Sequence, residues 1–152
     1  MTPTDENLIP RGEMKKVSHT PFDFTTPVAI GVGDSKRDSD KDLSQGGGFD
    51  HCFVFEKGRD ITKPFGEVYS KKSGILMTCY TDLPSVQLYA GCGLNQIGKG
   101  GKKYGRCGAF CLETQAIPNN VNVEEYASYG SSIFEAGQVY QTKTVYAFSL
   151  RK

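Results

Sequence analysis

Short strand-like segments separated by glycine-bearing turns make up most of this chain, and no stretch has the periodicity of an amphipathic helix. Glycine accounts for 18 of the 152 residues, well above the usual level of roughly 7%. The chain also contains 9 Phe and 8 Tyr but no Trp. These residues, together with Val and Thr, favour strands and turns over helices. The sequence therefore predicts an all-β fold.

The length of 152 residues predicts a single domain, residues 1–152. Its expected strands alternate with turn signals such as Lys-Lys-Ser-Gly at residues 71–74, which indicates a hairpin. Residues 32–48 are polar and almost without apolar side chains, so we expect a polar surface loop with one helical turn near residues 40–43. The expected strands cover residues 50–56, 65–70, 75–81, 85–91, 109–114 and 139–150.

A basic glycine-rich segment at residues 98–103 (Gly-Lys-Gly-Gly-Lys-Lys) superficially resembles a phosphate-binding loop. A P-loop requires a strand, the pattern Gly-Xaa4-Gly-Lys-Ser/Thr and then a helix. Here Lys102 is followed by Lys103 and Tyr104, and the continuation is strand-like. The segment is therefore predicted to be a solvated hairpin tip rather than a nucleotide site.

The charges nearly cancel, with 18 Lys and Arg against 17 Asp and Glu, which argues against binding of nucleic acid. No apolar run approaches the roughly 18 residues that a membrane span needs, and residues 1–10 lack the regions of a secretory signal. The five cysteines form no Cys-Xaa-Xaa-Cys pair and no zinc-ligand pattern. We expect free thiols, a reducing compartment, a cytoplasmic location and no bound metal.

Two acidic residues stand in strand-like sequence and are the best candidates for chemistry. Glu113 lies in Phe-Cys-Leu-Glu-Thr-Gln, where an ionised carboxylate inside a β core is costly unless it is paired or used. Asp50 opens a strand directly after a glycine run. Either acid could simply bond backbone amides, but a carboxylate pair beside glycine-lined strands also suits sugar chemistry. Gln87, between Val86 and Leu88, is either an ordinary strand residue or a further ligand for a hydroxyl group.

Neither histidine is a convincing proton donor from the sequence. His51 follows Asp50 directly, and successive side chains of a strand point to opposite faces. If Asp50 enters a cleft, His51 is expected to orient a loop or the backbone instead. His19 precedes Thr20-Pro21 and is expected to be an exposed turn residue.

Five motifs occur in one order along nearly the whole chain, and together they resemble the C-terminal half of the aldose 1-epimerase (galactose mutarotase) family. The closing segments, residues 137–140 and 144–148, are also similar to the family's final strands. The five motifs are Asn7–Glu13 (NLIPRGE), Thr20–Phe24 (TPFDF), Gly48–His51 (GFDH), Val86–Gly91 (VQLYAG) and Phe110–Gln115 (FCLETQ).

The resemblance implies an antiparallel β-sandwich, part of the family's large supersandwich, that holds a sugar on a concave sheet face. It implies that Glu113 is the general base that removes the proton of the C1 hydroxyl group, and that Asp50 and Gln87 bind sugar hydroxyls. The expected activity interconverts the α and β anomers of free hexoses, galactose or glucose. The resemblance implies no metal or organic cofactor, because the reaction only moves protons.

In the family, an upstream histidine protonates the ring oxygen, and this chain begins at Met1, just before the first motif. We therefore expect an isomerase that is impaired alone and is completed by a homodimer or by a complementary N-terminal half. One alternative is a non-catalytic carbohydrate-binding or regulatory remnant. Another is a glycosidase that uses Asp50 and Glu113 as carboxylates about 5–9.5 Å apart.

Overall fold

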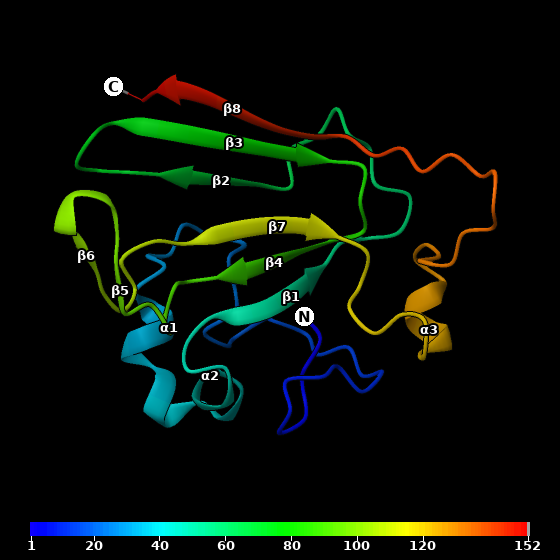
Figure 1. Ribbon diagram of the computed structural model, residues 1–152, viewed down its shortest axis with the longest axis horizontal. Coiled ribbons are helices and arrows are strands. Elements are labelled where there is room, and N and C mark those ends of the chain that lie inside the picture. The colour runs from blue at the N-terminus through cyan, green and yellow to red at the C-terminus, as the bar shows by residue number, and fades with distance from the viewer. Residues whose placement is uncertain (152) are drawn as a thin grey trace.

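The computed structural model describes residues 1–151, which form two three-stranded sheets, a two-stranded hairpin and a few single-turn helices (Figure 1). Every strand pair is antiparallel, as the sequence predicts. The inner sheet has the order β1-β4-β7, and the outer sheet has the order β2-β3-β8. The strands are β1 (Asp50–Val54), β2 (Gly66–Tyr69), β3 (Ile75–Thr81), β4 (Ser85–Tyr89), β5 (Gln96–Ile97), β6 (Lys103–Tyr104), β7 (Cys111–Gln115) and β8 (Thr144–Leu150).

One face of the inner sheet forms the main hydrophobic core. Leu88 of β4 is buried there, with Phe53 of β1 and Leu112 of β7 packed beside it. The preceding part of the chain covers this face with apolar side chains that include the fully buried Phe22 and Phe49. Because side chains alternate along a strand, the opposite face of the same sheet is free to hold polar groups.

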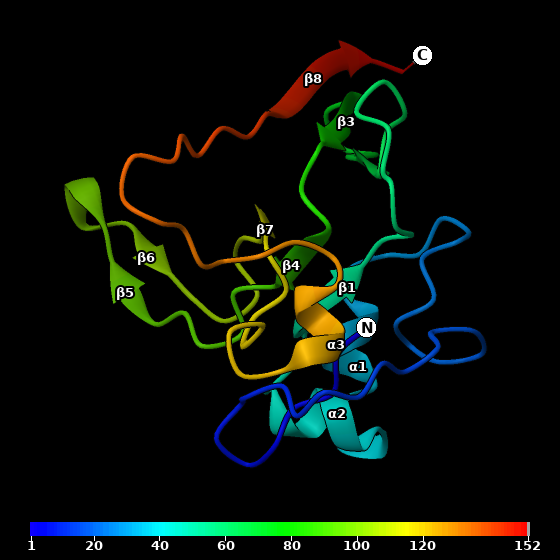
Figure 2. The ribbon, with the colours of Figure 1, turned by 90° about the vertical axis from the view of Figure 1, so that its right-hand side faces the viewer.

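The outer sheet is joined to the inner sheet by side-chain hydrogen bonds between β7 and β8. The Thr144 hydroxyl group lies 2.7 Å from that of Thr114 on β7 and 3.0 Å from that of Thr81 on β3. The Tyr146 hydroxyl group donates to the Leu112 carbonyl oxygen at 2.6 Å. In the view at a right angle to Figure 1, the inner sheet lies between strands β3 and β8 on one side and the helices of residues 32–45 on the other (Figure 2).

Residues 32–48 contain three single-turn helices, of which the one near residues 40–43 was expected and the other two were not. The Asp40 side chain accepts a hydrogen bond from the Leu43 backbone amide and so begins the third helix. Leu43 is fully buried, and burial of this one apolar side chain fixes a segment that is otherwise polar. The helices are α1 (Val32–Ser35), η1 (Arg37–Ser39) and α2 (Lys41–Gln45).

The predicted strands match the observed ones in position, with small differences at their ends. The last strand begins at Thr144 rather than at residue 139, and helix α3 (Glu124–Ala127) was not predicted. The basic glycine segment lies at the tip of the β5–β6 hairpin as the 3-10 helix η2 (Lys99–Gly101), so the hairpin prediction is confirmed. Among the described residues, no helix is long and apolar enough to cross a membrane.

Candidate functional site

A pocket of about 410 Å³ lies on the polar face of the inner sheet. Its floor consists of alternate side chains from all three strands, which the register places side by side: Cys52 is paired with Gln87, and Gln87 with Glu113. The structure thus brings together all three residues singled out in the sequence. The pocket is lined by Thr2, Thr4, Leu8, Pro10, Asp50, Cys52, Gln87, Tyr89, Glu113, Gln115 and Pro118.

Gln87 is at the centre of this floor, and only one of its two polar side-chain atoms has a hydrogen-bond partner. Its Nε2 atom donates to the Oδ1 atom of Asp50 at 2.7 Å. Its Oε1 atom is buried and has no hydrogen-bond partner. A buried acceptor without a donor costs free energy, and a ligand hydroxyl group can supply that donor. Asp50 and Gln87 therefore form a paired acceptor site at the base of the pocket.

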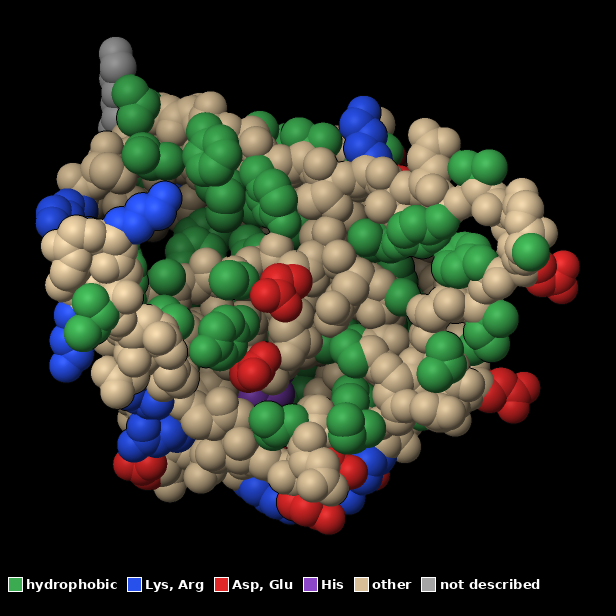
Figure 3. All heavy atoms as spheres, in the orientation of Figure 1, with side chains coloured by type: hydrophobic (Ala, Val, Ile, Leu, Met, Phe, Trp, Pro, Cys, Tyr) green, Lys and Arg blue, Asp and Glu red, His purple; other side chains and the backbone are tan. Residues whose placement is uncertain are grey.

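Glu113 is exposed rather than held in a β core, so the expectation of a buried acid is wrong. Its strand, β7, has both Cys111 and Glu113 exposed. The reason is the open sheet face: the main hydrophobic core packs against the opposite face, on which Leu112 lies. Figure 3 shows acidic side chains in the middle of this face, next to apolar groups, with Lys and Arg side chains at its margins. The Glu113 carboxylate is therefore accessible to a ligand in the pocket.

Asp50 is positioned by the glycine run that precedes β1. Gly48 has a φ of +127°, a conformation that favours glycine. A Cβ atom at Gly48 would lie 2.3 Å from the Cys92 sulfur, so a larger residue cannot be accommodated without movement. The backbone therefore enters β1 in one conformation, which aims the Asp50 side chain onto the pocket face.

His51 faces away from the pocket and orients the backbone, as predicted. Its Nδ1 atom accepts a hydrogen bond from the Asp50 backbone amide at 3.1 Å. The ring is 2% exposed, and its edge meets Phe22 with the ring centroids 4.7 Å apart. Burial lowers the pKa of His51, although the nearby Asp42 and Asp50 carboxylates oppose this. His51 therefore stays neutral near pH 7 and lies outside the pocket lining.

The N-terminal segment forms one wall of the pocket, which the sequence analysis missed. The Thr2 backbone amide donates to the Cys52 carbonyl oxygen at 3.0 Å along the edge of β1. Tyr126 of α3, fully buried, donates through its hydroxyl group to the Glu13 carbonyl oxygen at 2.8 Å. The Asn119 side chain holds the Pro10 carbonyl oxygen at 2.8 Å. Residues 119–126 therefore fasten the segment that closes this side of the site.

Two further floor residues could have been found from the sequence. Tyr89 follows Gln87 by two residues, and Gln115 follows Glu113 by two residues, so both lie on the same strand faces as the predicted groups. The contribution of residues 2–10 could not be found in this way, because no local periodicity connects them with β1.

The pocket's own groups suit the binding of neutral hydroxyls. No lysine, arginine or histidine is among its described lining residues. Burial raises the pKa of the Cys52 thiol, which keeps it protonated as part of the floor. Within residues 1–151, no three His, Cys, Asp or Glu side chains are grouped to hold a metal ion.

The chain is similar to known proteins over nearly its whole length. The model of the family "Aldose 1-epimerase" matches residues 1–147. Galactose mutarotase from Sus scrofa is 35% identical over 153 residues, and that from Homo sapiens is 36% identical over 151 residues. Each match covers 97% of this chain and 41% of the relative, so the chain spans about two fifths of their length. An aldose 1-epimerase from Haemophilus influenzae is 28% identical over 140 residues.

Solved structures agree on the fold. An aldose epimerase homologue from C. elegans superposes with a TM-score of 0.82 and 25% identity, over 99% of this chain and 43% of that one. A galactose 1-epimerase from Lactobacillus acidophilus gives a TM-score of 0.69 at 23% identity, over 98% of this chain and 41% of that one; at this identity the likeness concerns the fold alone. The family match over nearly the whole length decides the assignment: this chain belongs to the aldose 1-epimerase family.

Proposed function

We propose that this chain supplies the general base and the hydroxyl-binding groups of a site that interconverts the α and β anomers of free galactose or glucose. The observation that carries the proposal is the arrangement around Gln87. This side chain is bonded to Asp50 at 2.7 Å, is paired across the strands with Glu113, and has a buried oxygen without a donor. A sugar offers adjacent hydroxyl groups that both donate and accept, which matches these acceptors.

In the proposed reaction, the Glu113 carboxylate removes the proton of the C1 hydroxyl group. The C1–O electron pair forms the carbonyl, the bond from C1 to the ring oxygen breaks, and the ring oxygen takes a proton from a general acid. Rotation about C1–C2 and closure by the reverse steps on the other carbonyl face give the other anomer. Asp50 and Gln87 hold the remaining hydroxyls, so that the open chain recloses in place.

The general acid is proposed to come from a partner, either a complementary N-terminal half or a second copy of this chain. In the described structure His51 is buried on the far side of the sheet and does not line the pocket. Acid and base each contribute typically about 10²–10⁴-fold to a rate, so the chain by itself is proposed to be impaired. The setting is proposed to be the cytoplasm, since the five cysteines are free thiols.

Polarimetry of freshly dissolved α-D-galactose and α-D-glucose tests the proposed base. Any acceleration by the parent chain should fall by about 10²-fold or more in Glu113→Gln, because the amide cannot take a proton. Glu56→Gln is the matched control, since Glu56 is an exposed acid that lies just after β1 and outside the pocket lining. Equal rates for the parent and Glu113→Gln would overturn the assignment of the base.

A non-catalytic carbohydrate-binding role is the second candidate. It is favoured because no histidine, lysine or arginine among the described lining residues is there to act as the general acid. Calorimetry with galactose and glucose separates the two. If the parent chain binds sugar, loses this binding in Asp50→Asn and Gln87→Ala, and does not accelerate mutarotation over the uncatalysed rate, binding alone is supported. A folded chain that binds neither sugar at millimolar concentration would contradict both functions.

A further inference from the structure

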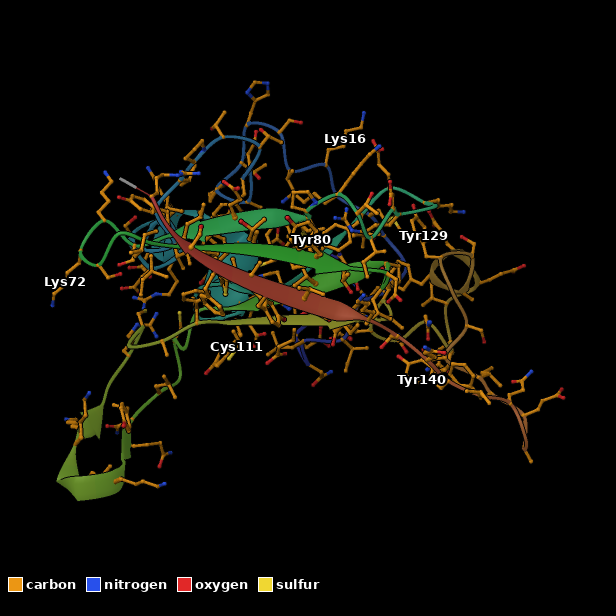
Figure 4. The ribbon with its side chains drawn as sticks, turned by 90° about the horizontal axis from the view of Figure 1, so that it is seen from above. Lys16, Lys72, Tyr80, Cys111, Tyr129 and Tyr140 are labelled. Atoms are coloured by element: carbon orange, nitrogen blue, oxygen red, sulfur yellow. The ribbon has the colours of Figure 1, made fainter. Side chains whose placement is uncertain are left out.

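Two cysteine side chains meet at the base of the β5–β6 hairpin, outside the pocket. Cys92 follows β4 and is buried, whereas Cys107 lies in the turn before β7 and is exposed. Their sulfur atoms are 3.5 Å apart, although the residues are 15 positions apart in the chain. The hairpin between them projects away from the body of the molecule (Figures 2 and 4).

Backbone contacts hold the two cysteines in this position. The Cys107 backbone amide donates to the Gly91 carbonyl oxygen at 3.0 Å. The neighbouring Arg106 guanidinium donates to the Cys92 carbonyl oxygen at 2.5 Å and to the Gly47 carbonyl oxygen at 2.6 Å. The same guanidinium is paired with Asp34 at 2.6 Å. The approach of the two thiols is therefore built into the turn and does not depend on a flexible loop.

We propose that Cys92 and Cys107 are a reversible oxidation site, which a peroxide converts into an intramolecular disulfide. A disulfide needs the two sulfurs about 2.05 Å apart, so they must approach by about 1.5 Å from the observed 3.5 Å. We expect rotation about the Cα–Cβ bond of the exposed Cys107 to contribute to this movement.

The chemistry balances with a hydroperoxide as the oxidant. The exposed Cys107 sulfur attacks one peroxide oxygen; the O–O bond breaks, an S–O bond forms, and for hydrogen peroxide water leaves with the thiol proton. The Cys92 sulfur then attacks the Cys107 sulfur; the S–O bond breaks, the S–S bond forms, and a second water leaves with the Cys92 proton. Two electrons pass from the thiols to the peroxide, and an external dithiol returns them.

The burial of Cys92 assigns the order of these steps. Burial raises the pKa of the Cys92 thiol to about 11. The contact with Cys107 is a second, smaller cause of this rise, and the positive charge of Arg106 opposes it. Cys92 is thus protonated at neutral pH and shielded from the oxidant, so Cys107 is the residue that reacts first. Closure of the disulfide should become faster as the pH rises from 7 to 9, because the fraction of Cys92 thiolate increases.

Intact mass spectrometry of the full chain tests the proposal. The reduced chain is treated with hydrogen peroxide at low protein concentration, denatured, and alkylated with N-ethylmaleimide. The parent should lose two alkylation sites out of its five cysteines, and digestion should recover a peptide that links Cys92 with Cys107. Treatment with dithiothreitol before alkylation should restore all five sites.

Cys107→Ser should abolish the linkage, and Cys111→Ser is its matched control. Cys111 is also an exposed free thiol, on β7 (Figure 4), and its replacement should leave the linkage unchanged. As a second measurement without oxidant, phenylarsine oxide, which bridges two nearby thiols, should bind the parent and Cys111→Ser one to one but not Cys107→Ser. Complete alkylation of Cys92 and Cys107 after peroxide, or a linkage that uses Cys111, would overturn the proposal.

Discussion

The two sheets of this molecule have the same number of strands and the same antiparallel pairing, yet their surroundings differ. The central strand of the inner sheet, β4, is bonded on both edges and packs its apolar side chains in the core. In the outer sheet, β8 is an edge strand, and nearly all of its side chains are exposed. Phe148 is 69% exposed and Leu150 74% exposed. The unpaired edge and the exposed apolar side chains of such a strand are open to pairing and packing.

The difference shows that apolar side chains are packed together behind the inner sheet but stay exposed along β8 of the outer sheet. The pocket is supported from behind by a continuous core, whereas apolar residues of 133–150 lie on the surface. This fits the comparison with relatives, of whose length the chain spans about two fifths.

The largest expected effect comes from truncating one phenylalanine in each region. Phe49 is fully buried, with ring centroids 5.5 Å from Phe22 and 5.3 Å from Phe24. Phe49→Ala should lower the free energy of unfolding by about 3–5 kcal/mol, because it leaves a cavity in the core. Phe148→Ala should change it by only about 0.5 kcal/mol, since this ring is already in water.

Urea unfolding followed by far-UV circular dichroism measures both changes. Repeating it over a range of protein concentrations sharpens the comparison. A Phe148→Ala cost that approaches that of Phe49→Ala, and that grows with concentration, would mean that β8 is covered by a second copy. The contrast between the two sheets would then apply only to the isolated chain.

An intermediate effect is expected where the two sheets are joined. The Thr144 hydroxyl group bonds to Thr114 on the inner sheet and to Thr81 on the outer sheet. Thr144→Val keeps the shape and removes both hydrogen bonds, so it should cost about 1–2 kcal/mol of unfolding free energy. Thr142→Val, at an exposed position two residues earlier, is the control and should be nearly neutral in the same urea titration. If the two variants are equally stable, these hydroxyls do not hold the sheets together.

The strands and the pocket floor could be predicted because their signals are local. Alternation and turn residues located β3 and its hairpin, and the alternation of faces placed His51 opposite Asp50. The exposure of Glu113 could not be predicted in this way. It depends on which face of the sheet the segments before β1 cover, and that is a property of packing between distant residues.

Helix α3 was missed for a related reason. A single turn such as α3 is too short to show helical periodicity, and its position is fixed by the Tyr126 hydroxyl group, which bonds to residues more than 110 positions away. The helical turn expected near residues 40–43 is α2, and it forms because Leu43 is buried and Asp40 caps its first turn. In both cases a long-range contact decides the local structure, which propensity within a short window does not contain.

The smallest effect is expected from the titration of His51 under the pocket floor. Its pKa in the folded chain is lowered by burial below the ordinary value of 6.5, so the unfolded chain binds the proton more readily. The free energy of unfolding should therefore be constant above pH 6.5 and should fall as the pH drops from 6.5 toward the folded pKa.

His51→Asn should remove this part of the pH dependence, whereas replacing the exposed His19 by Asn should leave it intact. Urea titrations of the three proteins between pH 5 and 8 measure the difference. Parallel curves for the parent and His51→Asn would show that this ring is not buried in its neutral form, which would contradict its role as acceptor of the hydrogen bond from the Asp50 backbone amide.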